Sequence, residues 1–89
     1  MIQRRSKLQI VYDLLMAAKQ KSRIKLTHLL YKGNLSHLRL KEYINELLSK
    51  KLLEKVNEDG KSYYKITPQG VKFLSDMEKM REITEAFGL

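Results

Sequence analysis

The feature that most constrains this chain is a change of hydrophobic period past its middle. Residues 52–57 and 62–66 are two short runs that include Val, Ile and Tyr, separated by Glu58-Asp59-Gly60-Lys61. Asp-Gly between two such runs predicts a β-hairpin, because a type I′ turn needs positive φ at both central residues. Thr67-Pro68 then predicts the start of a helix over residues 68–87, with Thr as N-cap and Pro in the first turn.

Before the hairpin the apolar side chains follow a helical period. Over residues 6–20 they recur at steps of three and four, which predicts a helix with one apolar face made of Leu8, Val11, Tyr12 and Leu15. Ser6 is the expected N-cap of this helix. Residues 23–26 alternate polar and apolar side chains, which predicts a short strand.

Two further helices are expected next. Thr27 is expected to cap a brief helix that stops at Gly33-Asn34, where both residues tolerate the positive φ of a tight C-cap. Ser36 is expected to begin a helix that runs to about Lys50, with a buried stripe of Leu40, Tyr43, Ile44, Leu47 and Leu48. Two helices joined by a short Gly-containing turn match the helix-turn-helix pattern.

The order helix, strand, helix, helix, hairpin, helix is that of a winged helix-turn-helix domain. We therefore predict a mainly α fold with a small β-hairpin (α+β) and a long C-terminal helix. At 89 residues the chain holds one core. Within it we expect residues 1–67 to form the winged helix and residues 68–89 a dimerisation helix continuous with it.

Three segments also carry a family resemblance. They are Thr27-His28-Leu29-Leu30-Tyr31-Lys32-Gly33-Asn34-Leu35-Ser36, then Tyr43-Ile44 with Leu47-Leu48, and Tyr64-Lys65-Ile66-Thr67-Pro68-Gln69-Gly70. Over residues 6–87 the chain resembles a family of small archaeal winged helix DNA-binding proteins, including the ten-kilodalton Sulfolobus-type proteins with a C-terminal coiled coil. The resemblance implies a dimer that binds double-stranded DNA.

The charge is concentrated in the first third of the chain. The net charge is +8, and residues 1–35 carry eight basic side chains against Asp13 alone. A concentrated positive field suits a polyanion such as nucleic acid. The alternative is a solvated, lysine-rich surface.

The helix that starts at Ser36 is the expected DNA reader. Burying its apolar stripe leaves Leu38, Glu42, Asn45 and Ser49 facing outward, with Arg39 and Lys41 beside them. Ser36 and His37 lie where helix-turn-helix proteins place base contacts. Arg39 could bond guanine and Asn45 adenine, and phosphate contact is an alternative for Arg39 and Lys41. A merely solvated face is the other alternative.

The N-terminal cations are expected on the DNA backbone. Cations at a helix N-terminus oppose its dipole, so Arg4, Arg5 and Lys7 do not stabilise the first helix. They are either phosphate contacts or neutral surface. The complete set of expected DNA-binding residues is Arg4, Arg5, Lys7, Lys25, Thr27, Tyr31, Lys32, Ser36, His37, Arg39, Lys41, Asn45 and Lys61.

The last helix carries two apolar stripes. Val71 and Leu74 are expected to face the core, with Gly70 permitting close approach. The second stripe has coiled-coil spacing and is the expected dimer seam: Phe73, Met77, Met80, Thr84 and Phe87. Alternatively, Phe73 and Met77 complete the monomer core and residues 81–89 fray.

Other function classes find little support. The chain has no cysteine, and His28 and His37 lie nine residues apart, which is no metal-ligand pattern. Four isolated glycines form no phosphate-cradling loop. We expect no catalysis, no cofactor, no metal and no small-molecule ligand. The longest apolar run, residues 14–18, is far short of a membrane span, and no signal peptide is evident, so a cytoplasmic location is expected.

The expected function is that of a homodimeric transcriptional regulator that binds double-stranded DNA. One alternative is nonspecific chromatin or architectural DNA binding. Another is a protein-interaction module, because the charge on the third predicted helix is balanced. RNA binding lacks a visible aromatic platform for stacked bases.

Overall fold

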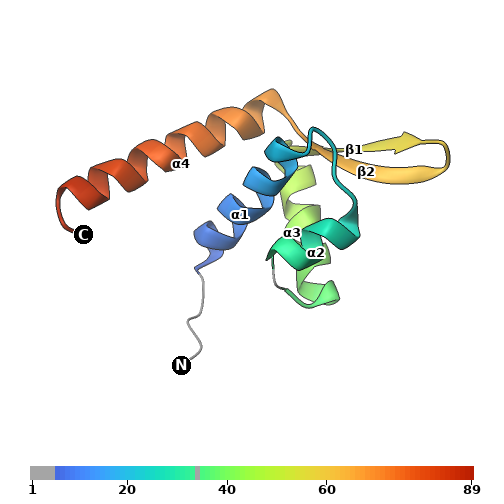
Figure 1. The fold of residues 1–89 in the computed structure, drawn as a ribbon, viewed down its shortest axis with the longest axis horizontal. Helices are drawn as coiled ribbons and strands as arrows, with labels where there is room; N and C mark the ends of the chain where they lie inside the picture. The colour runs from blue at the N-terminus through green and yellow to red at the C-terminus, as the bar shows by residue number, and fades with distance from the viewer. Residues whose placement is uncertain (1–5, 34) are drawn as a thin grey trace.

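Three helices, an antiparallel hairpin and a fourth helix follow one another in the computed structural model (Figure 1). The model describes residues 6–33 and 35–89, except for the side chains at positions 32 and 33. The predicted mainly α fold with a β-hairpin and a long C-terminal helix is confirmed. The elements are α1 (Lys7–Gln20), α2 (Leu26–Gly33), α3 (His37–Ser49), β1 (Leu53–Glu58), β2 (Lys61–Ile66) and α4 (Pro68–Ala86).

Three of the predicted helix starts are capped as expected. The hydroxyls of Ser6, Ser36 and Thr67 each accept a hydrogen bond from the backbone N–H three residues on, at 3.1, 3.3 and 2.9 Å. The Thr67 hydroxyl also donates to the carbonyl of Lys51 at 2.7 Å, which ties the start of α4 to the turn after α3. Local capping hydrogen bonds therefore determine where α1, α3 and α4 begin.

The cap predicted for α2 is wrong by two positions. The helix begins at Leu26, so Thr27 lies inside its first turn. The carbonyl of Lys25 accepts the N–H groups of the third and fourth residues after it at 3.0 and 3.2 Å, which makes Lys25 the capping position. Gly33 is the last helical residue. Asn34, the other half of the predicted C-cap, lies outside the described residues.

The predicted strand over residues 23–26 is also wrong. Only Ile24 pairs, donating its N–H to the Tyr64 carbonyl at 2.9 Å and accepting from the Tyr64 N–H at 2.8 Å. The pairing stays limited to Ile24, because Arg23 lies in a bend and α2 begins at Leu26. This isolated bridge nevertheless fixes the α1–α2 loop against β2.

The hairpin has the predicted turn. β1 and β2 pair in register from Leu53↔Ile66 to Glu58↔Lys61. Asp59 and Gly60 between them have φ of 49° and 74°, as a type I′ turn requires. Figure 1 shows the hairpin extending away from the helices as a wing, in the direction opposite to α4.

The core lies between the helices and the base of the hairpin. In α1 the side chain of Leu8 is 61% exposed, contrary to prediction, while Ile10 and Leu14, one turn apart, are buried. In α3 the expected stripe is confirmed in its centre and half-buried at its edges: Leu40, Ile44 and Leu47 are buried, and Tyr43 and Leu48 are intermediate.

Helix α4 meets the core at a glycine. A Cβ on Gly70 would lie 2.3 Å from the Leu52 carbonyl oxygen, so the expected close approach is confirmed. Leu74, one turn later, is buried. Val71 is 39% exposed, which contradicts its predicted core position, because the face through Gly70 and Leu74 turns it outward.

None of the helices in the described part of the chain is long and apolar enough to cross a membrane.

Candidate nucleic-acid interface

The outward face of α3 is a continuous solvent-exposed stripe. Leu38, Glu42, Asn45 and Ser49 recur at steps of four, three and four, and all are exposed, as predicted. Leu38 is 69% exposed at the N-terminal end of the stripe. The stripe thus offers an amide, a hydroxyl, a carboxylate and an apolar side chain to a partner.

The predicted cations lie on opposite flanks of this stripe. The Arg39 guanidinium lies 5.9 Å from the centre of the Tyr43 ring, on the flank of α3 that faces the start of α1. Helical spacing puts Lys41 on the other flank, where it is exposed. Ser36 and His37 are exposed at the N-terminal end, and the Ser36 hydroxyl caps the helix. Both cations therefore border the stripe and neither occupies its centre.

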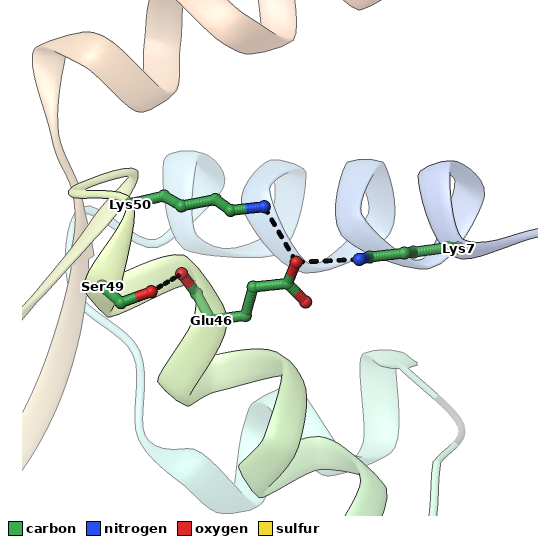
Figure 2. Close-up of polar contacts among 4 residues, drawn as sticks. All are labelled: Lys7, Glu46, Ser49 and Lys50. Atoms are coloured by element: carbon green, nitrogen blue, oxygen red, sulfur yellow. Dashed lines mark hydrogen bonds and ion pairs between the residues drawn. The ribbon is translucent and has the colours of Figure 1, made fainter.

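Lys7 has a carboxylate partner that the sequence pattern did not indicate. Its Nζ lies 2.8 Å from Oε1 of Glu46, and Nζ of Lys50 lies 2.9 Å from the same oxygen (Figure 2). Hydrogen bonds from Lys7 and then Lys50 hold the pKa of Glu46 below its ordinary value, and the bond to Glu46 raises the pKa of Lys7. Both shifts favour the charged forms of Lys7 and Glu46.

A shallow hollow of about 220 Å³ lies between α1 and α3 beside this cluster. It is lined by Lys7, Arg39, Glu42, Tyr43 and Glu46. The hollow joins the predicted Lys7 and Arg39, which are 32 positions apart in the chain, with two carboxylates.

A second basic cluster lies where the α1–α2 loop meets the wing. Arg23 and Lys25 place their charged groups 4.8 and 5.9 Å from the centre of the Tyr63 ring, within the range of cation–π attraction. Arg23 also forms an ion pair with Glu58. Lys25, one of the predicted DNA-binding residues, is exposed and lies near β2 through its contact with Tyr63.

Thr27, Tyr31 and Lys61 were also predicted to contact DNA. Thr27 and Tyr31 on α2 are exposed, Tyr31 by 81%. Lys61 is exposed at the hairpin turn, opposite Glu58 in the strand register. Arg4 and Arg5 lie outside the described residues, as does the side chain of Lys32.

Four residues of these clusters were missed by sequence reasoning: Arg23, Glu46, Lys50 and Tyr63. The Glu46–Lys50 pair could have been found, since an i,i+4 Glu–Lys pair on a helix is a known stabilising pattern. The approach of Lys7 to Glu46 and of Arg23 to Tyr63 depends on the tertiary fold, and no local pattern signals it.

The chemistry of these surfaces is that of ion pairing and hydrogen bonding. The described part of the chain contains no group of three or more His, Cys, Asp or Glu side chains that could hold a metal ion.

Comparison with known protein families agrees with the helix-turn-helix and hairpin arrangement of this fold. Residues 4–85 match the model of a family described as winged helix-turn-helix. The chain belongs to the winged helix-turn-helix family. No curated protein sequence matches it.

Solved winged helix structures superpose on most of the chain. Sso10a-2, a DNA-binding protein from Sulfolobus solfataricus, is 20% identical, with a TM-score of 0.79 over 93% of this chain and 85% of that one. The transcriptional regulator BldR from the same organism is 14% identical, with a TM-score of 0.73 over 89% and 60% of the two chains. BpsR of Bordetella bronchiseptica, whose DNA binding is regulated by 6-hydroxynicotinic acid, is 19% identical, with a TM-score of 0.74 over 86% and 58%.

At these identities the likeness establishes the fold. This winged helix-turn-helix chain spans most of Sso10a-2 but only about three-fifths of BldR and of BpsR.

Proposed function

We propose that this protein binds double-stranded DNA with α3 and its flanking cations, as a homodimeric transcriptional regulator. The observation that carries the proposal is the exposed α3 stripe, which offers Asn45 and Ser49 for hydrogen bonding between flanks that carry Arg39 and Lys41. The net charge of +8 supports it. So do the printed roles of Sso10a-2 as a DNA-binding protein and BldR as a transcriptional regulator.

In the proposed complex α3 enters the major groove, which is about 12 Å wide and admits a helix. Asn45 reads a base, since its amide can both donate to and accept from adenine. Arg39 and Lys41 pair with phosphates on either side of the groove. Exposed Lys25, Thr27 and Tyr31 extend the backbone contacts, and Lys61 touches the backbone from the wing.

Self-association through α4 is part of the proposal. Met80 and Phe87 in the expected seam are 60% and 78% exposed, and Ile83 beside them is 52% exposed. Figure 1 shows the C-terminal half of α4 extending away from α3. A contiguous apolar surface of this kind marks an interaction site. A second copy of α4 would cover it.

The start of the seam has a different environment. Phe73 is half-buried and packs against the monomer core, and Met77 and Thr84 are half-buried. The alternative that Phe73 helps complete the core is therefore supported for this residue. The proposed seam rests chiefly on Met80, Ile83 and Phe87.

We propose that the protein binds its partner and does not catalyse a reaction. We further propose that it acts in the cytoplasm, with DNA as that partner. The exposed histidines, His28 and His37, lie on different helices. The C-terminal domain boundary we propose is the Thr67 cap, where the dimerisation helix begins.

Nonspecific chromatin binding differs from regulation in the ratio of specific to random-DNA affinity, because affinity alone does not separate them. We would titrate labelled genomic fragments and a random-sequence duplex of equal length with the protein. A fragment bound at least about 10³-fold more tightly than random DNA supports regulation. Equal affinities would favour the chromatin role.

A protein-interaction role is the second candidate function. It is favoured by the apolar side chain of Leu38 at the head of the α3 stripe and by the neighbouring acidic Glu42, both exposed. Absence of salt-dependent binding to any duplex in the same titration would favour this role over DNA binding.

A further inference from the structure

We infer that the ammonium groups of Lys7 and Lys50 form a binding site for a phosphate of the DNA backbone, and that Glu46 fills this site in the free protein. The inference rests on the proposed DNA-binding function. It adds the Glu46 carboxylate as a competitor of the DNA phosphate. It also adds Lys50, a cation that was not among the residues predicted from the sequence to bind DNA.

The geometry is that of an occupied anion site. A single carboxylate oxygen of Glu46 accepts from both lysines, at 2.8 and 2.9 Å, and the two side chains reach it from α1 and from the end of α3 (Figure 2). A phosphate oxygen between two ammonium groups would make the same contacts. The carboxylate therefore stands where a phosphate oxygen could stand.

The position suits a DNA backbone beside α3. Arg39, Tyr43, Glu46 and Lys50 recur at steps of four, three and four, so they form one flank of the helix next to the outward stripe. Arg39 and Lys7 line the same hollow of about 220 Å³. Arg39 therefore lies on the same flank of α3 as the proposed site and shares a hollow with Lys7.

The carboxylate can be displaced. The side chains of Lys7 and Lys50 are 61% and 62% exposed, so both can turn toward a new partner, and Glu46 is 32% exposed. Exposed ion pairs are weak and screened by salt, whereas DNA presents a row of phosphates that releases bound counterions on contact. While Glu46 stays charged, the cluster offers one net positive charge instead of two.

The test compares Glu46→Gln with Glu82→Gln. The two variants change the net charge equally, but Glu82 lies on the exposed surface of α4. If the inference holds, Glu46→Gln gains one phosphate contact in each protomer, two per dimer. Its slope of log K against log salt steepens by about 1.8, and its affinity near 50 mM salt rises on the order of 10²-fold. Glu82→Gln should stay close to wild type in slope and affinity.

Lys7→Met shows whether the gain passes through the site. In the Glu46→Gln background it should remove most of the added affinity and return the slope toward that of wild type. If Glu46 is only a clasp between α1 and α3, Glu46→Gln and Lys7→Met would each lower the melting temperature, and neither would steepen the slope. That result would overturn the inference. The salt slope and the melting temperature can both be measured even if Glu46→Gln is destabilised.

Two further comparisons are informative. One examines competition by free phosphate, and the other distinguishes a failure of this inference from a failure of the proposed function. Replacing chloride by inorganic phosphate at constant ionic strength should weaken DNA binding by Glu46→Gln more than by Glu82→Gln, because free phosphate competes with the DNA backbone for the opened site. An equal effect on both variants would contradict the assignment of this site to a DNA phosphate. If wild type binds DNA and the two variants behave alike, this inference alone fails. If wild type shows no salt-dependent DNA binding, the proposed function fails with it.

Discussion

Asn45 stands in the middle of the exposed α3 stripe, with its amide free to face a groove. Because an amide reads one base pair, Asn45→Ala should relax preference at a single position of the site by about 1–3 kcal/mol. Affinity for a panel of singly substituted duplexes measures this. Lys41→Ala on the flank is the control and should weaken all duplexes alike. A uniform loss for Asn45→Ala would assign Asn45 to the backbone.

The charge on Glu46 links folding stability to pH. Its pKa is lowered in the folded protein from an ordinary value of 4.5, so the stabilisation is present above that value and is lost as the pH falls through the folded pKa. Urea unfolding at about pH 7 and about pH 3 should therefore show a smaller loss of stability for Glu46→Gln than for wild type. Glu82→Gln should keep the wild-type acid response. An equal loss in all three proteins would contradict a stabilising role for the Glu46 charge.

Sequence reasoning at the residue scale succeeds where the cause is local. The caps at Ser6, Ser36 and Thr67 need only a hydroxyl and the next three residues, and the structure confirms them. The pairing of Lys7 with Glu46 joins residues 39 positions apart. This pairing depends on the position of α1 relative to α3. The number of charged residues in the sequence does not reveal that position.

At the scale of elements, the packing of α4 depends on the contact of Gly70 with Leu52, just before β1, and with Ile66 of β2. A methyl group at this position would lie 2.3 Å from a backbone oxygen and 2.7 Å from Ile66, so a segment must shift. Gly70→Ala should destabilise the fold by about 1–3 kcal/mol, as overpacking does, despite the better helix propensity of Ala. Thermal unfolding measures it, with the exposed Ser75→Ala in the same helix as control. An unchanged or raised melting temperature for Gly70→Ala would contradict this packing.

The elements show which local signals prevail. Two residues with positive φ at Asp59 and Gly60 determined the hairpin, and the prediction was confirmed. The alternation over residues 23–26 did not produce a strand, because α2 begins at Leu26 and Arg23 lies in a bend, so that only Ile24 pairs. Val71 was misplaced because the spacing of apolar residues alone did not reveal that Gly70 is the contact point.

At the scale of the molecule, we expect a partner chain to cover the exposed apolar side chains at the C-terminal end of α4. Burying an apolar side chain is worth about 1.5–3 kcal/mol, and Met80 is 60% exposed in the monomer. Met80→Glu should place like charges across the two-fold axis, dissociate the dimer, and lower DNA binding more than folding, because linked half-sites gain from effective concentration. Sedimentation reports the mass. Ser75→Glu is the matched control and should stay dimeric.

The wild type must itself be a dimer for this to hold. A mass near 10.5 kDa at micromolar concentration, instead of twice that, would show that the exposed apolar side chains of α4 do not join two copies.

The fold and the outward α3 stripe followed from periodicity and turn chemistry, while the ion pairs that modify the interface came only from the structure. Binding of DNA is the claim that connects both, and its most direct measurement is the salt dependence of affinity for duplex DNA. With six to ten phosphate contacts per dimer, affinity should fall on the order of 10³–10⁵ between about 50 and 200 mM salt. An affinity that does not change over this range would contradict the account.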